Sequence, residues 1–219
     1  MRKRIEVVAD VLETNEAAAQ ENRRLLDQAG VVAINVLSAP GSGKTALLEK
    51  TIPALKPRPC TVLVGDLQTS RDAERLAAVT SQVVQINTGG GCHLSAEEVA
   101  EGLKRLKLER ASVLFIENVG NMVCPVSFDL GEHARVALLS VPEGDDKVAK
   151  YQSLFQSADV ILLTKTDLLS VLEFRVQLVR DDLARINTRA PLIELSTKTG
   201  AGMDQWLAWL STRIDGIGV

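Results

Sequence analysis

The sequence has few cysteines and no long apolar run, and these absences narrow the class of protein. Three cysteines among 219 residues are too few, and odd in number, for a disulfide framework. No apolar run approaches the roughly 20 residues that a membrane-spanning helix needs. No apolar stretch follows the basic residues of Met1–Arg4, so no signal peptide is evident. We therefore expect a cytoplasmic protein that does not interact with a membrane.

An excess of charge of one sign is also lacking. The formal net charge is −3, which gives no reason to expect a nucleic-acid partner. Charged residues make up 24% and hydrophobic residues 46% of the chain, the balance of an ordinary globular protein with a buried core. The sequence contains no repeat and no low-complexity linker. We therefore expect residues 1–219 to form a single domain, with a leading helix at 1–30 and a core at 31–219.

The most informative stretch that is present is the segment SAPGSGKT at residues 38–45. It follows a strand-like run at 31–37 and opens a helical pattern at 46–50, and this order is typical of a phosphate-binding loop. Glycines let several backbone N–H groups point at a phosphate, and the helix N-terminus adds positive potential. Lys44 supplies a cation for the outer phosphates, and the Thr45 hydroxyl is a candidate Mg²⁺ ligand. The predicted nucleotide-binding residues of this loop are Pro40, Gly41, Ser42, Gly43, Lys44, Thr45 and Ala46.

One position of this loop departs from its common form. Ser38 stands where that form has glycine. A serine costs little there if the residue lies at negative φ. The alternative is a glycine-rich turn with a surface lysine, which the flanking strand and helix patterns disfavour.

Short apolar segments alternate with helical patterns along the chain. Strands are expected at 31–37, 60–64, 83–86, 112–116, 136–141, 158–163 and 192–195. Helices are expected at 6–29, at 71–79, from a capping box at Ser95 and Glu98, along a stripe from Leu172 to Ile186, and from Gly202 onward. The run at 22–24 in the first helix is expected to be a solvated face. The alternation predicts a doubly wound α/β fold with a mostly parallel sheet.

Polar residues lie at the ends of several expected strands, where ligands bind in folds of this kind. Asp66 and Glu117 end two such strands. Both carboxylates are candidates to hold Mg²⁺ with Thr45, and together with Lys44 they are the predicted catalytic residues. Gly120 would let a backbone N–H approach a γ-phosphate. The alternative is that each acid is a solvated loop residue.

A segment at 164–167 resembles the N-K-x-D motif by which GTPases select guanine. The Asp167 carboxylate would accept hydrogen bonds from the guanine N1–H and exocyclic amine, a pair that adenine does not offer. The Lys165 stem would lie along the base. Thr164 replaces the usual asparagine, so the sequence does not decide whether one supporting hydrogen bond of this motif forms. A second base-contacting loop would follow the last strand, so we predict GTP over ATP, with contacts from Lys165, Asp167, Ser196, Thr197 and Lys198.

Two of the cysteines lie near a histidine in loop-like sequence. Cys92 and His93 follow three glycines, and Cys124 comes shortly after Glu117. Two thiols and an imidazole suit Zn²⁺ or Ni²⁺, although three ligands leave a four-coordinate site incomplete. From this chemistry alone, a metal site and a pair of structural cysteines both remain open. Cys60, at a strand start, is expected in the core, and His133 on the surface.

These motifs together are similar to those of one known family. The resemblance covers nearly the whole chain and is carried by Val11-Leu12 with Asn15, Asn22-Arg23, the loop at 38–45, Gly65-Asp66 with Thr69, Asp72-Ala73, 91–94, 117–121, 123–125, 128–132, Glu143-Gly144 with Asp146-Lys147, Lys150-Tyr151 and Ala158-Asp159. It resembles the HypB family, the GTPases that help to insert nickel during maturation of nickel–iron hydrogenases. Few other proteins with a phosphate-binding loop would match at so many places.

The resemblance implies a P-loop NTPase fold of the SIMIBI GTPase type with an N-terminal helix. It also implies Mg²⁺-dependent GTP hydrolysis and a homodimer that depends on nucleotide. Cys92, His93 and Cys124 would bind Ni²⁺ or Zn²⁺ near the dimer interface. The hydrogenase large subunit and other maturation proteins would be partners. No glutamine stands out to position water, so we expect slow turnover.

Some family members carry an N-terminal cysteine-rich or histidine-rich nickel motif. The first 30 residues here contain no Cys or His, so nickel binding would fall to the site within the GTPase domain. Cys124 is only seven residues beyond Glu117, which suggests the hypothesis that a γ-phosphate-dependent shift reaches the metal site.

Other classes of function remain alternatives. One is a phosphotransferase or kinase that uses the same loop, with structural cysteines. Another is a nucleotide-gated dimerisation switch with negligible turnover. The urease nickel-insertion GTPase shares the fold, but its Cys-Pro-His motif is not matched, because Cys124-Pro125 is followed by Val126.

Overall fold

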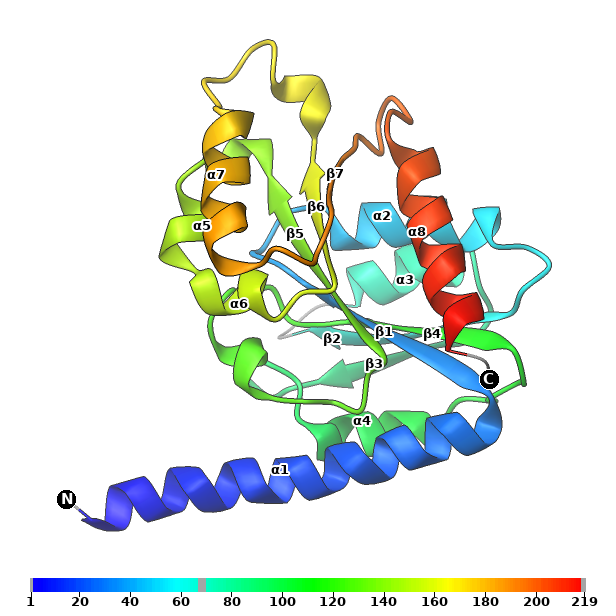
Figure 1. Ribbon diagram of the computed structural model, residues 1–219. Helices are drawn as coiled ribbons and strands as arrows, with labels where there is room; N and C mark the ends of the chain where they lie inside the picture. Colours follow the sequence, from blue (N-terminus) through cyan, green and yellow to red (C-terminus); the bar gives the residue numbers. More distant parts are fainter. Residues whose placement is uncertain (1, 67–69, 218–219) are drawn as a thin grey trace.

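A parallel β-sheet forms the centre of the molecule. The computed structural model describes residues 2–66 and 70–217, with only the backbone of residues 2–10 described (Figure 1). Thr69, one of the residues that carry the family resemblance, lies outside this part of the chain. Seven strands pair in the order β3-β2-β4-β1-β5-β6-β7, and every pairing is parallel. The strands are β1 (Val31–Leu37), β2 (Cys60–Asp66), β3 (Val83–Asn87), β4 (Ser112–Glu117), β5 (Ala134–Ser140), β6 (Val160–Thr164) and β7 (Leu192–Glu194).

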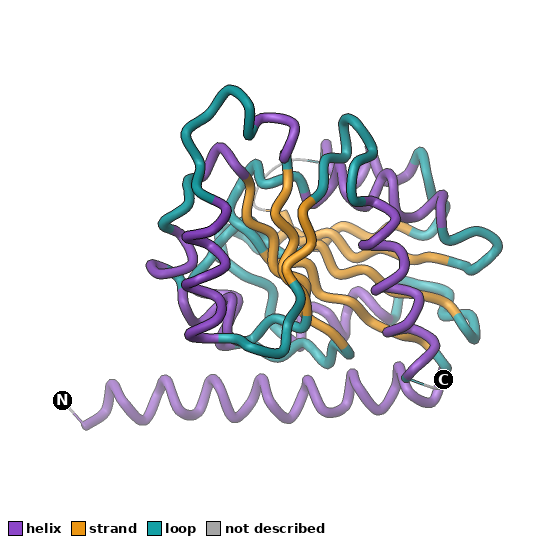
Figure 2. Tube along the Cα trace, turned by 45° about the horizontal axis from the view of Figure 1, so that its top comes forward, coloured by secondary structure: helices purple, strands orange, loops and turns teal. Residues whose placement is uncertain are grey.

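Helices cover both faces of the sheet (Figures 1 and 2). Within the described residues they are α1 (Arg2–Ala29), α2 (Lys44–Ala54), α3 (Arg71–Ala77), α4 (Ala96–Leu103), α5 (Lys147–Lys150), α6 (Gln152–Gln156), α7 (Val176–Ile186) and α8 (Met203–Gly216), with 3-10 turns η1 (Cys124–Ser127), η2 (Val141–Glu143) and η3 (Thr166–Leu168). Helices α2, α3 and α8 pack on one face, and α1, α4 and α5–α7 on the other. The predicted doubly wound α/β fold with an N-terminal helix is confirmed. No described helix is both long and apolar enough to span a membrane.

Strand β1 explains why the phosphate loop lies where it does. All seven of its residues are buried. Val32 and Ile34 pack toward α2 and α8, while Val31 and Ala33 pack toward α1 and α4. Strand β4 lies on one side of β1 and β5 on the other. The loop after β1 therefore opens at the centre of the carboxyl edge of the sheet, where open α/β sheets bind ligands.

One expected helix begins later than its apolar stripe suggested. Helix α7 starts at Val176 rather than near Leu172, which lies in an irregular segment and is 42% exposed. The Asp145 carboxylate accepts hydrogen bonds from the backbone N–H and the side chain of Arg175, at 2.9 and 2.8 Å. These contacts fix an extended backbone immediately before the helix. The sequence pattern gave no sign of them because Asp145 lies thirty residues away.

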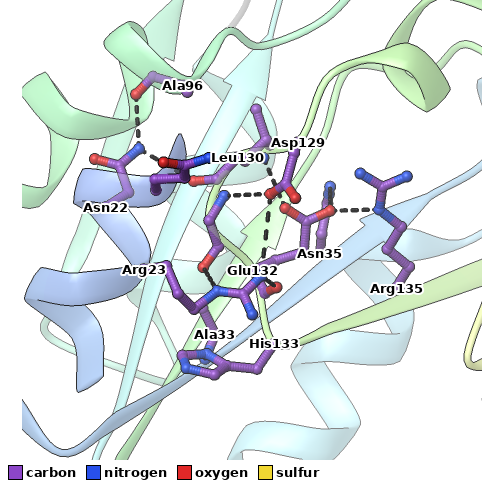
Figure 3. A network of polar contacts seen from close by, with 12 residues as sticks. Asn22, Arg23, Ala33, Asn35, Ala96, Asp129, Leu130, Glu132, His133 and Arg135 are labelled. Carbon is purple, nitrogen blue, oxygen red and sulfur yellow. Dashed lines mark hydrogen bonds and ion pairs between the residues drawn. The ribbon is translucent and has the colours of Figure 1, made fainter. Parts of the chain in front are cut away.

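Helix α1 is bound to the rest of the molecule by polar side chains, contrary to the expectation for residues 22–24. Asn22 is buried, and its amide donates to the Leu130 carbonyl at 3.1 Å (Figure 3). Arg24 alone fits the expectation of a solvated residue, since it is exposed and pairs with Glu21. The expectation for His133 was also wrong, because its side chain is only 6% exposed.

Candidate nucleotide and metal site

The loop between β1 and α2 lines a polar cavity of about 350 Å³ at the carboxyl edge of the sheet. Gly41 and Gly43 have φ values of +77° and +104°, a left-handed backbone that L side chains rarely adopt. This conformation lets the chain curl around the cavity before α2 begins at Lys44. The lining residues are Pro40, Gly41, Gly43, Lys44, Thr45, Ala46, Gly65, Asp66, Asp72, Arg75, Glu117, Asn118, Val119 and Gly120.

Lys44, Thr45 and Glu117 line this cavity with two ionisable groups and one hydroxyl. All three are buried. The Thr45 hydroxyl donates to Glu117 Oε1 at 2.7 Å. Glu117 Oε2 is also buried and has no hydrogen-bond partner among the described residues. Burial raises the pKa of Glu117 to about 7, although Lys44 and the Thr45 hydrogen bond act in the opposite direction.

This arrangement fits a hard divalent cation. A buried carboxylate oxygen without a partner, beside a threonine hydroxyl, matches the oxygen ligands that Mg²⁺ prefers. Bound positive charge would also offset the burial that now favours the protonated form of Glu117. Asp66 lies at the end of β2 and lines the same cavity. The Lys44 ammonium donates to the Ser38 hydroxyl at 3.2 Å, and burial lowers its pKa.

Gly120 brings the chain after β4 against the phosphate loop. A Cβ atom at this position would lie 2.9 Å from both the Cα and the N of Pro40. Any larger residue would therefore push the two backbones apart. The expected approach of a Gly120 N–H to a γ-phosphate stays a prediction, and the group that Gly120 meets in the structure is Pro40 of the phosphate loop.

Other polar residues at the cavity were not among the predicted site residues. Asp72 and Arg75 of α3 line it, and Arg75 also donates to Glu49 at 2.9 and 2.6 Å. Glu143 follows β5 and accepts a hydrogen bond from the Ser42 hydroxyl and, at 2.8 Å, from Ser140. The rule that singled out Asp66 and Glu117, an acid after a strand, would have found Glu143. Asp72 was marked only as part of the family resemblance and Arg75 not at all, because helix α3 brings both side chains to the cavity.

The two segments expected to bind guanine lie together, and the first of them contacts Gly41 and Ser42 of the phosphate loop. Thr164 donates its hydroxyl hydrogen to the Ser42 carbonyl at 2.7 Å, so this residue supplies a supporting hydrogen bond. The Lys165 ammonium donates to Gly41 O at 2.7 Å. The Ser196 hydroxyl donates to Asp167 at 2.7 Å.

Two further residues of the second segment complete this arrangement. The Lys198 ammonium lies 3.9 Å from a carboxylate oxygen of Asp167, and Thr197 is half-buried beside it. The Ser196 hydroxyl and the Lys198 ammonium thus orient the Asp167 carboxylate. An oriented carboxylate at this point can accept the paired hydrogen bonds of a guanine edge.

The structure brings Cys92, His93 and Cys124 together. One ligand atom from each lies within 4.8 Å of the other two, and Cys92 Sγ is 3.5 Å from His93 Nδ1. A hydrogen bond with Cys124 raises the pKa of the Cys92 thiol, and burial lowers the pKa of His93. One imidazole and two thiols form a donor set for a soft or borderline cation. Cys60 lies apart in the core, as expected, and burial raises its pKa to about 11.

Packing holds the imidazole of this cluster in place. The His93 ring lies against the Phe128 ring, with centroids 3.9 Å apart. Phe128 follows η1, the turn that Cys124 opens. The two segments that supply the three side chains therefore also touch through an aromatic contact.

Asn118 joins the cluster of Cys92, His93 and Cys124 to the cavity at the phosphate loop. It is buried, and it directly follows Glu117. Its side-chain oxygen accepts hydrogen bonds from the backbone N–H of Leu94 at 3.3 Å and of Val119 at 2.9 Å. Leu94 directly follows His93. One amide side chain thus spans from the acid of the cavity to the loop that carries two of the metal-ligand candidates.

Comparison with known proteins places this site in a family context. The family model described as "CobW/HypB/UreG, nucleotide-binding domain" matches residues 32–194. The hydrogenase maturation factor HypB of Escherichia coli K12 is 46% identical over 97% of this chain and 73% of its own length. The probable hydrogenase maturation factor HypB of Methanocaldococcus jannaschii is 39% identical over 96% of both chains.

Solved structures agree with the sequence comparison. HypB from Helicobacter pylori, crystallised in complex with nickel, superposes with a TM-score of 0.88 at 38% identity, covering 93% of this chain and 97% of that one. The signal recognition particle 54 kDa protein of Aeropyrum pernix, with a TM-score of 0.58 at 14% identity over 86% of this chain and 48% of that one, shares the fold alone. The chain belongs to the CobW/HypB/UreG family of nucleotide-binding proteins and, within it, to the HypB group.

Proposed function

We propose that this protein is a GTP-hydrolysing metallochaperone that binds Ni²⁺ or Zn²⁺ as cargo and assists nickel insertion into a nickel–iron hydrogenase. The observation that carries the proposal is the convergence of Cys92, His93 and Cys124 within 4.8 Å, joined through Asn118 to a phosphate-loop cavity. We also propose that residues 1–219 act as one GTPase domain. Its partners would be a second copy of the chain, the hydrogenase large subunit and other cytoplasmic maturation proteins.

Catalysis at the phosphates would consist of positioning and electrostatic stabilisation. The backbone N–H groups of residues 40–46 would hold the phosphates, and the Lys44 ammonium would offset charge as the γ-phosphoryl group leaves. Mg²⁺, held by Thr45 with Asp66 and Glu117 nearby, would supply further positive charge to the phosphate oxygens. Among the described residues that line the cavity there is no glutamine to orient water, which supports slow turnover.

Guanine selection by Asp167 can be tested directly. In Asp167→Asn an amide replaces the carboxylate, so one acceptor becomes a donor and the match to the guanine edge is lost. The xanthine edge carries a carbonyl where guanine has the amine, and it should now fit better. We expect GTP binding to weaken at least about tenfold while XTP binding improves, as measured by competition against a fluorescent GDP. An unchanged preference for GTP would remove Asp167 from the base site, and equal binding of ATP by the unaltered protein would favour a phosphotransferase.

The metal proposal calls for titration of the reduced protein with Ni²⁺ and Zn²⁺, with and without a non-hydrolysable GTP analogue. We expect about one ion per chain or per dimer. Cys92→Ala and Cys124→Ala should abolish specific binding. Cys60→Ala is the matched control, because that thiol is buried away from the cluster, and it should leave binding unchanged. Mass measured in parallel tests the dimer, and absence of specific binding in both states would leave the cysteines structural.

A further inference from the structure

Helix α1 contacts the two segments that supply the metal-ligand candidates. Asn15 is 6% exposed. Its side-chain oxygen accepts a hydrogen bond from the backbone N–H of Ala96 at 2.8 Å. Its amide nitrogen donates to the Asp129 carbonyl at 2.8 Å. One side chain thus bonds to two stretches of chain that are far apart in the sequence.

Asn22, seven residues further along the helix, repeats this pattern. It is 3% exposed. Its amide nitrogen donates to the Ala96 carbonyl at 2.8 Å and to the Leu130 carbonyl at 3.1 Å (Figure 3). Ala96 is therefore bonded through its N–H by one asparagine and through its carbonyl by the other.

The two stretches held in this way lead directly to the metal cluster. Ala96 begins α4, three residues after His93, and its backbone is fixed further by the capping box of Ser95. Asp129 follows Phe128, whose ring lies against His93. Cys124 opens the turn that leads to Phe128. Each asparagine therefore links the start of α4, three residues after His93, to the loop that follows Phe128 on the Cys124 side.

A third contact fixes α1 against the second of these stretches. A Cβ at Gly131 would lie 2.7 Å from the Ala19 carbonyl oxygen, so the loop touches the helix backbone. The Arg23 guanidinium donates to the Gly131 carbonyl at 2.9 Å and to the Glu132 carbonyl. The Glu132 carboxylate in turn accepts from the backbone N–H of Leu130 at 2.7 Å. These contacts hold the loop at 131–132 against helix α1.

Apolar packing would be enough to hold a helix on a sheet, so the buried amides call for another explanation. A buried amide costs free energy unless its donors and acceptors are paired. Here the amides of Asn15 and Asn22 pair with backbone groups of two separate stretches of chain. The hydrogen bonds therefore fix the distance between those two stretches. Satisfied polar contacts of this kind specify one geometry.

We propose that Asn15 and Asn22 are positioning residues of the metal site: together they hold the Cys92–His93 segment and the Cys124 segment at the separation that allows one ion to contact all three side chains. This inference rests on the proposed function, since it takes those three side chains as the ligands. Neither asparagine touches the ion itself. Both act through the backbone, as residues that orient metal ligands commonly do.

The test compares Asn15→Ala/Asn22→Ala with Gln20→Ala, an exposed residue of the same helix whose amide donates to Glu16 at 3.2 Å. Ni²⁺ affinity is measured by titration of the reduced protein. In parallel, phenylarsine oxide joins two neighbouring thiols through one arsenic atom with loss of water, and the rate of that bridging between Cys92 and Cys124 is followed by intact mass. Binding of a fluorescent GDP serves as a check on the rest of the fold.

We expect the double variant to lose about tenfold or more in Ni²⁺ affinity and to form the arsenic bridge more slowly, because the effective concentration of the second thiol falls. GDP binding should match that of Gln20→Ala. Equal Ni²⁺ affinity and equal bridging rates in the two variants would overturn the inference. A parallel loss of GDP affinity would also overturn it, because the effect would then be general destabilisation.

Asn15→Asp keeps the proposal testable if the double variant does not fold. It retains the oxygen that accepts from Ala96 and replaces the donor to the Asp129 carbonyl by a carboxylate oxygen, which that carbonyl repels. We expect weaker Ni²⁺ binding and slower bridging from this single change, and unchanged values would contradict the inference. If the unaltered protein binds neither Ni²⁺ nor Zn²⁺, the proposed function fails, and the bridging rates of the same variants still decide the positioning role.

Discussion

At the scale of single residues, the Thr164 hydroxyl ties the guanine-side segment to the phosphate loop by donating to the Ser42 carbonyl at 2.7 Å. Thr164→Val keeps the shape of the side chain and leaves a buried carbonyl without this donor. A lost hydrogen bond of this kind costs about 1 kcal/mol, so we expect the GDP dissociation constant to rise about fivefold. Titration with a fluorescent GDP measures it. Thr164→Ser, which keeps the hydroxyl, should bind as the unaltered protein does, and equal weakening in both variants would show that the methyl group matters instead.

His133 makes the stability of the fold depend on pH. The Ala33 N–H donates to His133 Nδ1 at 2.9 Å, so the neutral ring carries its proton on Nε2 and donates it to Asp27, at 2.9 Å. Burial lowers the pKa of His133, against the effect of the Asp27 hydrogen bond. Since the folded pKa lies below the unfolded one, the unfolded chain binds more protons as the pH falls below about 6.5. The contribution of this group is therefore present above that pH and lost below it.

The measurement is urea unfolding of the metal-free protein between pH 7.5 and 5. We expect a loss in free energy of unfolding of about 1 kcal/mol that His133 accounts for, the worth of one buried hydrogen bond. His133→Gln retains a side-chain acceptor and does not titrate, so its curve should be flatter over this range. Parallel curves for the two proteins would assign the pH dependence to other groups.

At the same scale, the sequence was informative about residues whose role follows from their position in a local pattern. Lys44 and Thr45 were predicted from a loop between a strand and a helix, Asp66 and Glu117 from the ends of strands, and all four line the same cavity. Asn22 and His133 were misjudged, because their partners lie about a hundred residues away along the chain. A polar residue with a distant backbone partner looks the same in sequence as a solvated one.

At the scale of elements, Gly131 decides how closely the loop before β5 approaches α1. Its φ is +87°, and a Cβ would lie 2.7 Å from the Ala19 carbonyl oxygen and 2.8 Å from the Arg23 nitrogen. Gly131→Ala must either strain the loop or push it from the helix. We expect a loss of about 2 kcal/mol or more in free energy of unfolding, measured in urea.

The control for this prediction is Gly216→Ala at the end of α8. A Cβ there meets no atom within 4 Å, and alanine favours helix over glycine by up to about 1 kcal/mol. Stability should hold or rise slightly. A similar loss in the two variants would mean that the contact of the loop with α1 is not what makes position 131 sensitive.

The elements themselves were predicted well where their pattern is long and local. All seven strands lie within a few residues of the apolar runs, and the capping box of Ser95 and Glu98 is present as expected. Helices α5 and α6 were missed because four or five residues are too few for a helical period. The start of α7 was misplaced because a contact from Asp145 overrides the apolar stripe.

At the scale of the whole molecule, Asn118 offers a route by which nucleotide and metal can affect each other. Its side chain accepts a hydrogen bond from the backbone N–H of Leu94, which follows His93. Asn118 itself directly follows Glu117, which lines the cavity. A γ-phosphate that displaces the end of β4 would therefore shift the loop of Cys92. We expect Ni²⁺ affinity to differ about fivefold or more between complexes with GDP and with a non-hydrolysable GTP analogue.

Linkage makes this prediction testable from both sides. If the analogue changes Ni²⁺ affinity by some factor relative to GDP, Ni²⁺ must change the preference for the analogue over GDP by the same factor. Asn118→Ala removes the acceptor for the Leu94 N–H. In this variant nucleotide should change Ni²⁺ affinity less, and Ni²⁺ should change the nucleotide preference less. Asn118→Asp retains that acceptor and loses only the donation to Asn35, at 3.3 Å, so it should keep more of the coupling. Equal Ni²⁺ affinities with the two nucleotides in the unaltered protein would contradict the switch. If nucleotide still changes Ni²⁺ affinity in Asn118→Ala, we would assign the coupling to the segment between Glu117 and Cys124 instead.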